Sequence, residues 1–149
     1  MRERFTEMLK TAMKAGDKPR VATVRLIQAA LKDRDIEARG AGKTVSDDDI
    51  LALLQKMVKQ RQDSIALYEQ GGRVDLADQE RAEIAIIAEF LPRAMDESEV
   101  AAAIRAAIAE TGAASPKDMG KVIGALKAKF AGRMDFGKVS PAVKAALGG

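Results

Sequence analysis

The side chains that could do chemistry in this 149-residue sequence are lysine, aspartate, glutamate, serine and one tyrosine, because cysteine, histidine and tryptophan are all absent. Without cysteine there is no thiolate nucleophile, disulfide or iron–sulfur site, and without cysteine and histidine the usual zinc sites are excluded as well. Serine–histidine catalysis is excluded for the same reason. No residue is therefore predicted to be catalytic.

Charged residues interrupt two apolar helical stripes in the middle of the sequence. Arg61 falls in line with core-type side chains of one predicted helix, and Glu80 and Glu83 do so in the next. An unpaired buried charge costs several kcal/mol, so we expect Arg61 to pair with Glu80 or Glu83 across the helix–helix seam. Two alternatives stay open: a catalytic or ligand-binding cluster of Arg61 and Glu80 with Lys59 and Ser64, or an Arg61 that extends to solvent.

Neither a metal site nor a cofactor site is expected. Asp47, Asp48 and Asp49 follow one another on a helix, so their side chains diverge by about 100° per residue and cannot converge on one ion. Gly40 and Gly42 lack the spacing of a phosphate-binding loop, and no strand precedes them. The serines are scattered and lie mostly at helix caps, which is not the arrangement of a glutamine-hydrolysing site.

The most informative surface is predicted on a helix that runs from the Ser115–Pro116 start to Phe130. Its apolar stripe leaves an opposite face made of small and basic residues. Two glycines on that face each cost roughly 1 kcal/mol relative to alanine, so close approach of another backbone is a reason to place them there. The residues of this face are Lys117, Gly120, Lys121, Gly124, Ala128 and Ala131.

The net charge of +3 is carried by the last third of the sequence. Residues 1–92 contain 16 Lys/Arg and 16 Asp/Glu, whereas residues 117–149 contain 7 and 2. Basic residues concentrated in this way favour an anionic partner, and few aromatics are available to stack bases, so we expect tRNA or another structured RNA. A partner helix on the glycine face is the alternative. The expected RNA contacts are Lys117, Lys121, Lys127, Arg133 and Lys138.

Apolar periodicity predicts an all-α protein with a domain boundary after Pro92, giving an N-terminal domain 1–92 and a C-terminal domain 93–149. In the second helix, Leu26 is expected to widen the apolar stripe. Four helices precede the boundary and three follow it. Their predicted ranges are about 5–15, 17–38, 46–70, 75–91, 96–111, 116–130 and a short helix from Ser140, with a loop over 133–138.

The N-terminal residues Met1–Phe5 are charged, which argues against a secretory signal peptide, and no apolar run is long enough to cross a bilayer. We therefore expect a cytoplasmic protein without a membrane partner.

Several motifs together resemble the GatB/YqeY family over essentially the whole chain, in particular its free-standing YqeY-like members. The residues that carry the resemblance are Lys59-Gln60-Arg61-x-x-Ser64, Asp75-Leu76-Ala77 with Glu80, Leu91-Pro92, Lys117-Asp118-Met119-Gly120-Lys121-Val122, Gly132-Arg133-x-Asp135 and Val139-Ser140.

This resemblance implies a four-helix bundle followed by a small three-helix bundle. A related tail domain belongs to the B subunit of the glutamine-dependent Asp/Glu-tRNA amidotransferase, where it grips tRNA, so the resemblance implies a tRNA-binding role and a translation-related partner. That role would fall on Gly120, Lys121, Gly124, Lys127, Gly132 and Arg133. Free-standing members often carry the label of a carbon–nitrogen ligase with glutamine as donor, which the residue inventory does not support.

Overall fold

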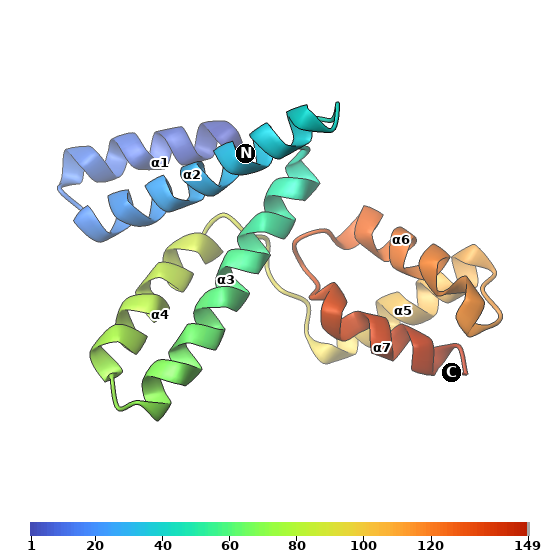
Figure 1. The fold of residues 1–149 in the computed structure, drawn as a ribbon. Coiled ribbons are helices and arrows are strands. Elements are labelled where there is room, and N and C mark those ends of the chain that lie inside the picture. The colour runs from blue at the N-terminus through green and yellow to red at the C-terminus, as the bar shows by residue number, and fades with distance from the viewer. Residues whose placement is uncertain (149) are drawn as a thin grey trace. The chain divides into compact units, whose positions relative to one another are not determined.

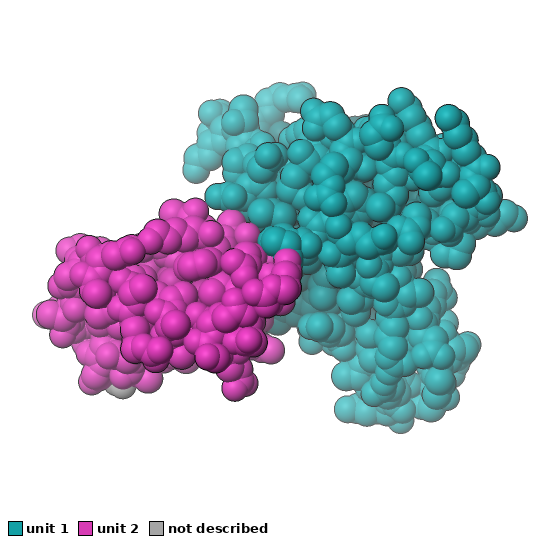
Figure 2. All heavy atoms as spheres, turned by 180° about the vertical axis from the view of Figure 1, so that it is seen from behind, with its two compact units in different colours: residues 1–92 teal, residues 93–149 magenta. Residues whose placement is uncertain are grey.

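The computed structural model describes residues 1–148, which contain seven α-helices, one 3₁₀ turn and no strand (Figure 1). The all-α class is therefore confirmed. The chain divides into two compact units, residues 1–92 and the residues from Arg93 onward (Figure 2). Each unit buries its own apolar cluster, so each has a core of its own.

Two helical hairpins make up the first unit. One turns at Gly16, whose left-handed φ of 69° ends the first helix, and Asp17 caps the second helix by accepting a 3.2 Å hydrogen bond from the Arg20 amide. A capping box of Ser46 and Asp49 starts the third helix. The helices are α1 (Arg2–Ala15), α2 (Lys18–Gly40), α3 (Asp47–Gln70) and α4 (Val74–Ala88).

The hairpins meet over only part of their length. Buried residues of α3 end at Met57, although the helix continues to Gln70. In the facing first half of α4, only Ala77 is buried. The distal parts of α3 and α4 therefore form a two-helix arm (Figure 1), and the first unit is not a bundle packed along its whole length. Leu26, expected in the core stripe of α2, is 46% exposed.

The second unit packs three helices around an aliphatic core. Val122 and Leu126 of the middle helix are fully buried against Ile104 and Val143 of its neighbours. Asp96 and Glu99 form the capping box that starts the first helix of this unit. The elements are α5 (Glu97–Thr111), the 3₁₀ turn η1 (Pro116–Asp118), α6 (Met119–Phe130) and α7 (Phe136–Ala146).

Two predicted helix starts are wrong. Ser115 makes no side-chain cap, and Pro116 opens a 3₁₀ turn, so α6 begins at Met119. The last helix begins at Phe136 rather than Ser140, because Asp135 caps it by accepting a 3.0 Å hydrogen bond from the Gly137 amide. Pro141 consequently lies inside α7.

Candidate nucleic-acid interface

The outer face of α6 is open. Val122 and Leu126 point into the core, so residues about 180° around the helix point away from it. Gly120 and Gly124 are exposed, and a Cβ atom built on either would meet no heavy atom within 4 Å. Packing inside the unit therefore does not require glycine at these positions.

Exposed lysines flank the two glycines. The Lys121 side chain is 70% exposed, and its Nζ lies 4.0 Å from the Asp118 carboxylate, a loose pair at the surface. Lys117 is exposed in η1, one turn before Gly120. Lys127 is exposed on the side of α6 that faces α7. We call the set Lys117, Gly120, Lys121, Gly124 and Lys127 the glycine–lysine face.

Phe136, the one aromatic expected in a loop, is not free to stack on a base. It is the first residue of α7, partly buried against the core of the unit. The Lys127 Nζ lies 5.7 Å from its ring centroid, within the range of a cation–π contact. Phe136 therefore holds Lys127 at the edge of the glycine–lysine face.

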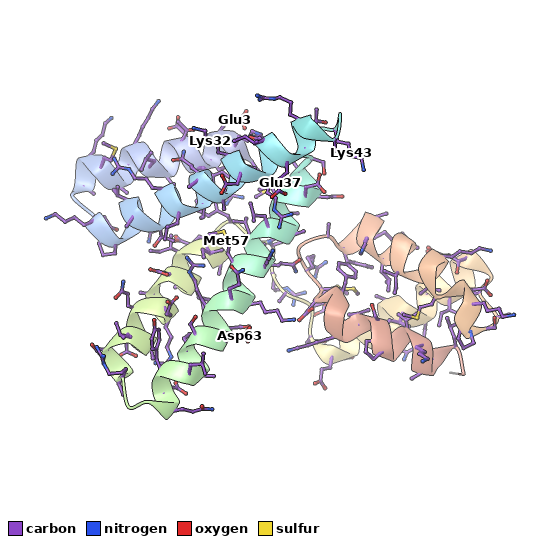
Figure 3. All side chains as sticks on the ribbon, viewed as in Figure 1. Glu3, Lys32, Glu37, Lys43, Met57 and Asp63 are labelled. Atoms are coloured by element: carbon purple, nitrogen blue, oxygen red, sulfur yellow. The ribbon has the colours of Figure 1, made fainter. Side chains whose placement is uncertain are left out.

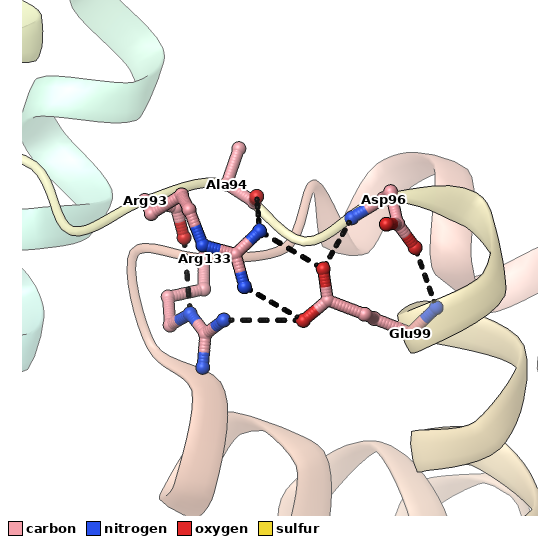
Figure 4. Close-up of polar contacts among 5 residues, drawn as sticks. All are labelled: Arg93, Ala94, Asp96, Glu99 and Arg133. Atoms are coloured by element: carbon pink, nitrogen blue, oxygen red, sulfur yellow. Dashed lines mark hydrogen bonds and ion pairs between the residues drawn. The ribbon is translucent and has the colours of Figure 1, made fainter.

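Arg133 lies apart from the glycine–lysine face, in a network at the start of the second unit (Figure 4). Its Nε donates a 3.0 Å hydrogen bond to the Arg93 carbonyl, and its Nη2 lies 3.6 Å from the Glu99 carboxylate. Arg93 donates two hydrogen bonds of 2.9 and 2.8 Å to the same carboxylate. The Met95 amide donates to the Arg133 carbonyl at 3.1 Å. These bonds fasten the residues after Pro92 to the turn before α7.

Glu99 is the centre of this network, and its lowered pKa predicts that the stability of the second unit depends on pH. The bidentate Arg93 bonds, followed by the Asp96 amide bond, lower the pKa of Glu99 to about 2. The stabilisation is present above the usual glutamate pKa of about 4.3 and is lost as the pH falls toward the folded-state value. Glu99→Gln should therefore lower the melting temperature of the second unit at about pH 7, and the difference from wild type should shrink by about pH 3. An equal difference at both pH values would contradict this assignment.

Lys138 borders a groove between α5 and α7. This open groove, about 950 Å³ in volume, has an apolar lining that includes Val100, Ile104 and Val139. Lys138 and Arg105 stand on its two walls, and neither side chain has a hydrogen bond or ion pair within the described residues. The structure thus brings five of the seven predicted RNA-binding residues onto one face and leaves Arg133 and Lys138 elsewhere in the unit.

The charged residues of the α3–α4 seam lie where a structural ion pair requires them. Arg61 Nε donates a 2.8 Å hydrogen bond to Glu83 Oε2 and lies 3.8 Å from Glu80 Oε2. Its Nη1 donates to the Met57 carbonyl at 3.1 Å. The three side chains are 14–21% exposed, so this cluster is largely withdrawn from water. Ser64, a member of the alternative cluster, donates its hydroxyl to the Gln60 carbonyl of its own helix.

The two acids of this seam should respond differently to neutralisation. Burial, and then the neighbouring Glu83 charge, raise the pKa of Glu80, so its charged form is disfavoured. Glu80→Gln should leave the free energy of unfolding unchanged or raise it. Glu83→Gln removes the close partner of Arg61 and should lower it by about 1–2 kcal/mol. Urea denaturation at neutral pH measures both, and a larger loss for Glu80→Gln would contradict this division of roles.

Sequence reasoning missed two groups that shape the site. Lys129 belongs to the basic third of the chain, yet both its contacts are 2.8 Å hydrogen bonds to Glu110 on α5. Arg93 donates to the Glu99 carboxylate, and Glu99 also forms the capping box with Asp96. Within the described residues, no group of three or more acidic side chains is placed to hold a metal ion.

Comparison with known proteins finds one matching family and several curated relatives. Residues 2–147 match the model of the family described as Yqey-like protein. Several curated relatives carry the name "Altered inheritance of mitochondria protein 41, mitochondrial", among them the following three. The Lachancea thermotolerans protein is 36% identical over 56% of this chain and 43% of its own length. The Clavispora lusitaniae protein is 37% identical over 60% of this chain and 52% of its own length. The Pyrenophora tritici-repentis protein is 29% identical over 94% of this chain and 77% of its own length. The chain thus spans about half the length of the first two.

The predicted cytoplasmic location is contradicted by these relatives, which are all named as mitochondrial proteins. The charged N-terminus argued only against secretion, and that argument does not separate the cytoplasm from an organelle. No helix in the described part of the chain combines the length and hydropathy needed to cross a membrane.

Proposed function

The chain belongs to the family of Yqey-like proteins, and from this premise we propose that it is a non-catalytic helical module that binds tRNA or another structured RNA. The observation that carries the proposal is the open space over Gly120 and Gly124, bordered by exposed Lys117 and Lys121. A phosphate backbone can approach such a surface closely while the lysines neutralise its charge.

Shape and charge are the chemistry that this surface offers. It carries no exposed aromatic ring, since Phe136 is packed against the core, so single-stranded bases have nothing to stack on. Recognition of a folded RNA through its backbone needs only basic groups at suitable spacing. The resemblance to the tRNA-gripping tail of the amidotransferase B subunit points in the same direction and rests on family analogy.

Titration of labelled total tRNA in about 50 and 200 mM salt tests this proposal. Lys121→Glu should weaken binding by about three- to tenfold and make it less dependent on salt. Lys56→Glu is the matched control, because Lys56 is exposed on α3 and has no side-chain partner within the described residues. Absent binding, or an equal loss in both variants, would defeat the proposal.

A second candidate is a protein–protein adaptor that receives a partner helix on the glycine–lysine face. The four-residue spacing of Gly120 and Gly124 favours it, because small residues at this spacing let two helices approach closely. This candidate predicts that Gly124→Leu abolishes capture of a protein partner while tRNA binding stays unchanged. The RNA proposal predicts instead that Gly124→Leu weakens tRNA binding.

The amide-transfer chemistry of the related amidotransferase is not proposed for this chain. We expect no turnover when the protein is supplied with glutamine, ATP and misacylated tRNA, because no activated nucleophile is present in its residue inventory. Product formation by the purified chain would overturn the non-catalytic part of the proposal.

A further inference from the structure

A row of four basic residues runs along α2, in the unit that does not carry the glycine–lysine face. Lys18, Arg25, Lys32 and Arg39 follow one another at intervals of seven residues, and all four are exposed. At 1.5 Å per residue they are spaced by about 10.5 Å and cover about 31 Å of helix. We call these four residues the basic stripe; Lys32 extends from α2 in Figure 3.

The basic stripe is not engaged by the unit that carries it. Lys18, Arg25 and Lys32 make no side-chain hydrogen bond or ion pair within the described residues, and Arg39 has only a longer-range attraction to Asp35. By contrast, the Arg20 side chain of the same helix pairs with Asp17 and Glu89. Internal ion pairing therefore does not explain the stripe.

Small and apolar residues alternate with these cations. Ala22, Ala29 and Ile36 each follow a basic residue by four positions and precede the next by three. This alternation of four and three is the spacing of a helix–helix seam, with the cations at one of its two core positions. Ile36 is 56% exposed, and so is Met13 on the neighbouring α1. Other residues of the first unit therefore leave these two apolar side chains largely open to solvent.

The surface is also hollowed where α1 and α2 adjoin. A depression of about 430 Å³ lies at the turn between the helices, and Met13, Val21 and Ala22 line it beside Lys18 and Arg25. A second depression, of about 210 Å³, is lined by α1 residues and by Lys32 farther along α2. The first hollow has mainly apolar walls with the free cations Lys18 and Arg25 at its edge, and the second is lined mostly by polar residues. This surface suits an elongated partner that carries both apolar and acidic side chains.

We propose that this face of the α1–α2 hairpin binds an acidic amphipathic helix of a partner protein, about three heptads long, whose carboxylates pair with the basic stripe. The exposed Met13 and Ile36 would have no role against RNA phosphates. Asp33 and Glu37, exposed on the other edge of α2, would repel phosphates but can pair with lysines of a partner helix. This inference concerns a different unit from the proposed RNA interface and goes beyond it.

A synthetic probe tests the inference directly. The probe is a fluorescent helical peptide of about three heptads with leucine and alanine at one core position and glutamate at the other. Binding to the full chain is measured by fluorescence anisotropy at low and high salt. Arg25→Glu/Lys32→Glu should weaken binding at least tenfold, while circular dichroism shows the fold unchanged, because both side chains are exposed and unpaired.

A matched control and a charge exchange complete the experiment. Lys56→Glu/Lys59→Glu changes the net charge equally on α3, where both lysines are exposed, and should leave binding within twofold of wild type. A peptide with lysine in place of glutamate should bind Arg25→Glu/Lys32→Glu better than it binds wild type. The inference is overturned if the acidic peptide binds wild type no better than the lysine peptide, or if both double variants lose binding equally. It is also overturned if Arg25→Glu/Lys32→Glu abolishes tRNA binding and leaves peptide binding intact.

Discussion

Phe90→Ala is expected to lower the free energy of unfolding of residues 1–92 by about 3–5 kcal/mol. Phe90 is 2% exposed and follows the end of α4. Its ring meets that of Phe5 on α1 edge to face, with centroids 4.7 Å apart. The Arg4 guanidinium lies 5.3 Å above the same ring. Truncation leaves a cavity where α1 contacts the residues that follow α4, and it also removes the aromatic pair.

The loss should be confined to the first unit, because the second unit has a separate core. Hydrogen exchange followed by mass spectrometry distinguishes the two: protection should fall in α1–α4 and persist in α5–α7. Leu67→Ala is the control, since Leu67 is 67% exposed and its truncation should cost less than about 0.5 kcal/mol. Equal effects of the two substitutions, or loss of protection in α5–α7, would show that Phe90 does not have this local role.

Local signals predicted most helix starts well. The helices predicted from about residues 46 and 96 do begin there, because the Ser46 and Asp96 capping boxes each depend on a partner only three residues away. Gly16 and Gly112 end their helices in the left-handed conformation that favours glycine. These features need no tertiary contact, and a single sequence contains all the information that determines them.

The last helix shows where local reasoning fails. Ser140–Pro141 has the pattern of a helix start, yet α7 begins four residues earlier at Phe136. Val139 is buried in the core of the second unit and Phe136 is partly buried against it, and this packing extends the helix through residues that look like a loop. Inside the helix, the Ser140 hydroxyl donates a 2.7 Å hydrogen bond to the Phe136 carbonyl. A tertiary contact thus overrides the local signal.

In the candidate site, too, features set by local spacing could be predicted and contacts between distant residues could not. Helical spacing alone identifies the outward direction of Gly120, Lys121 and Gly124, because it follows from the apolar stripe of their own helix. It cannot identify the partner of Arg133, whose Nε bonds to the Arg93 carbonyl forty residues earlier. A count of charges also cannot identify partners. It gives the same weight to Lys129, which is paired with Glu110, and to Lys138, which has no partner within the described residues.

The triple variant Lys117→Glu/Lys121→Glu/Lys127→Glu is expected to weaken tRNA binding at least about a hundredfold at moderate salt. All three side chains are exposed, and among the residues that the structure describes only two loose contacts hold them: Lys121 with Asp118 at 4.0 Å, and Lys127 with the Phe136 ring at 5.7 Å. Their reversal therefore costs the fold little. It replaces three attractive groups of the glycine–lysine face with three repulsive ones.

The salt dependence distinguishes an interface from diffuse attraction. Each lysine that neutralises a phosphate steepens the fall of log K with log salt by roughly 0.7–0.9, so three lost contacts should flatten that slope by about 2 to 3. Lys10→Glu/Lys56→Glu/Lys59→Glu changes the net charge equally on exposed residues of α1 and α3. If RNA lies on the glycine–lysine face, this control keeps the wild-type slope and most of the affinity. If both triple variants lose affinity and slope alike, the chain attracts RNA only through its overall charge, and the open space above Gly120 and Gly124 needs another occupant.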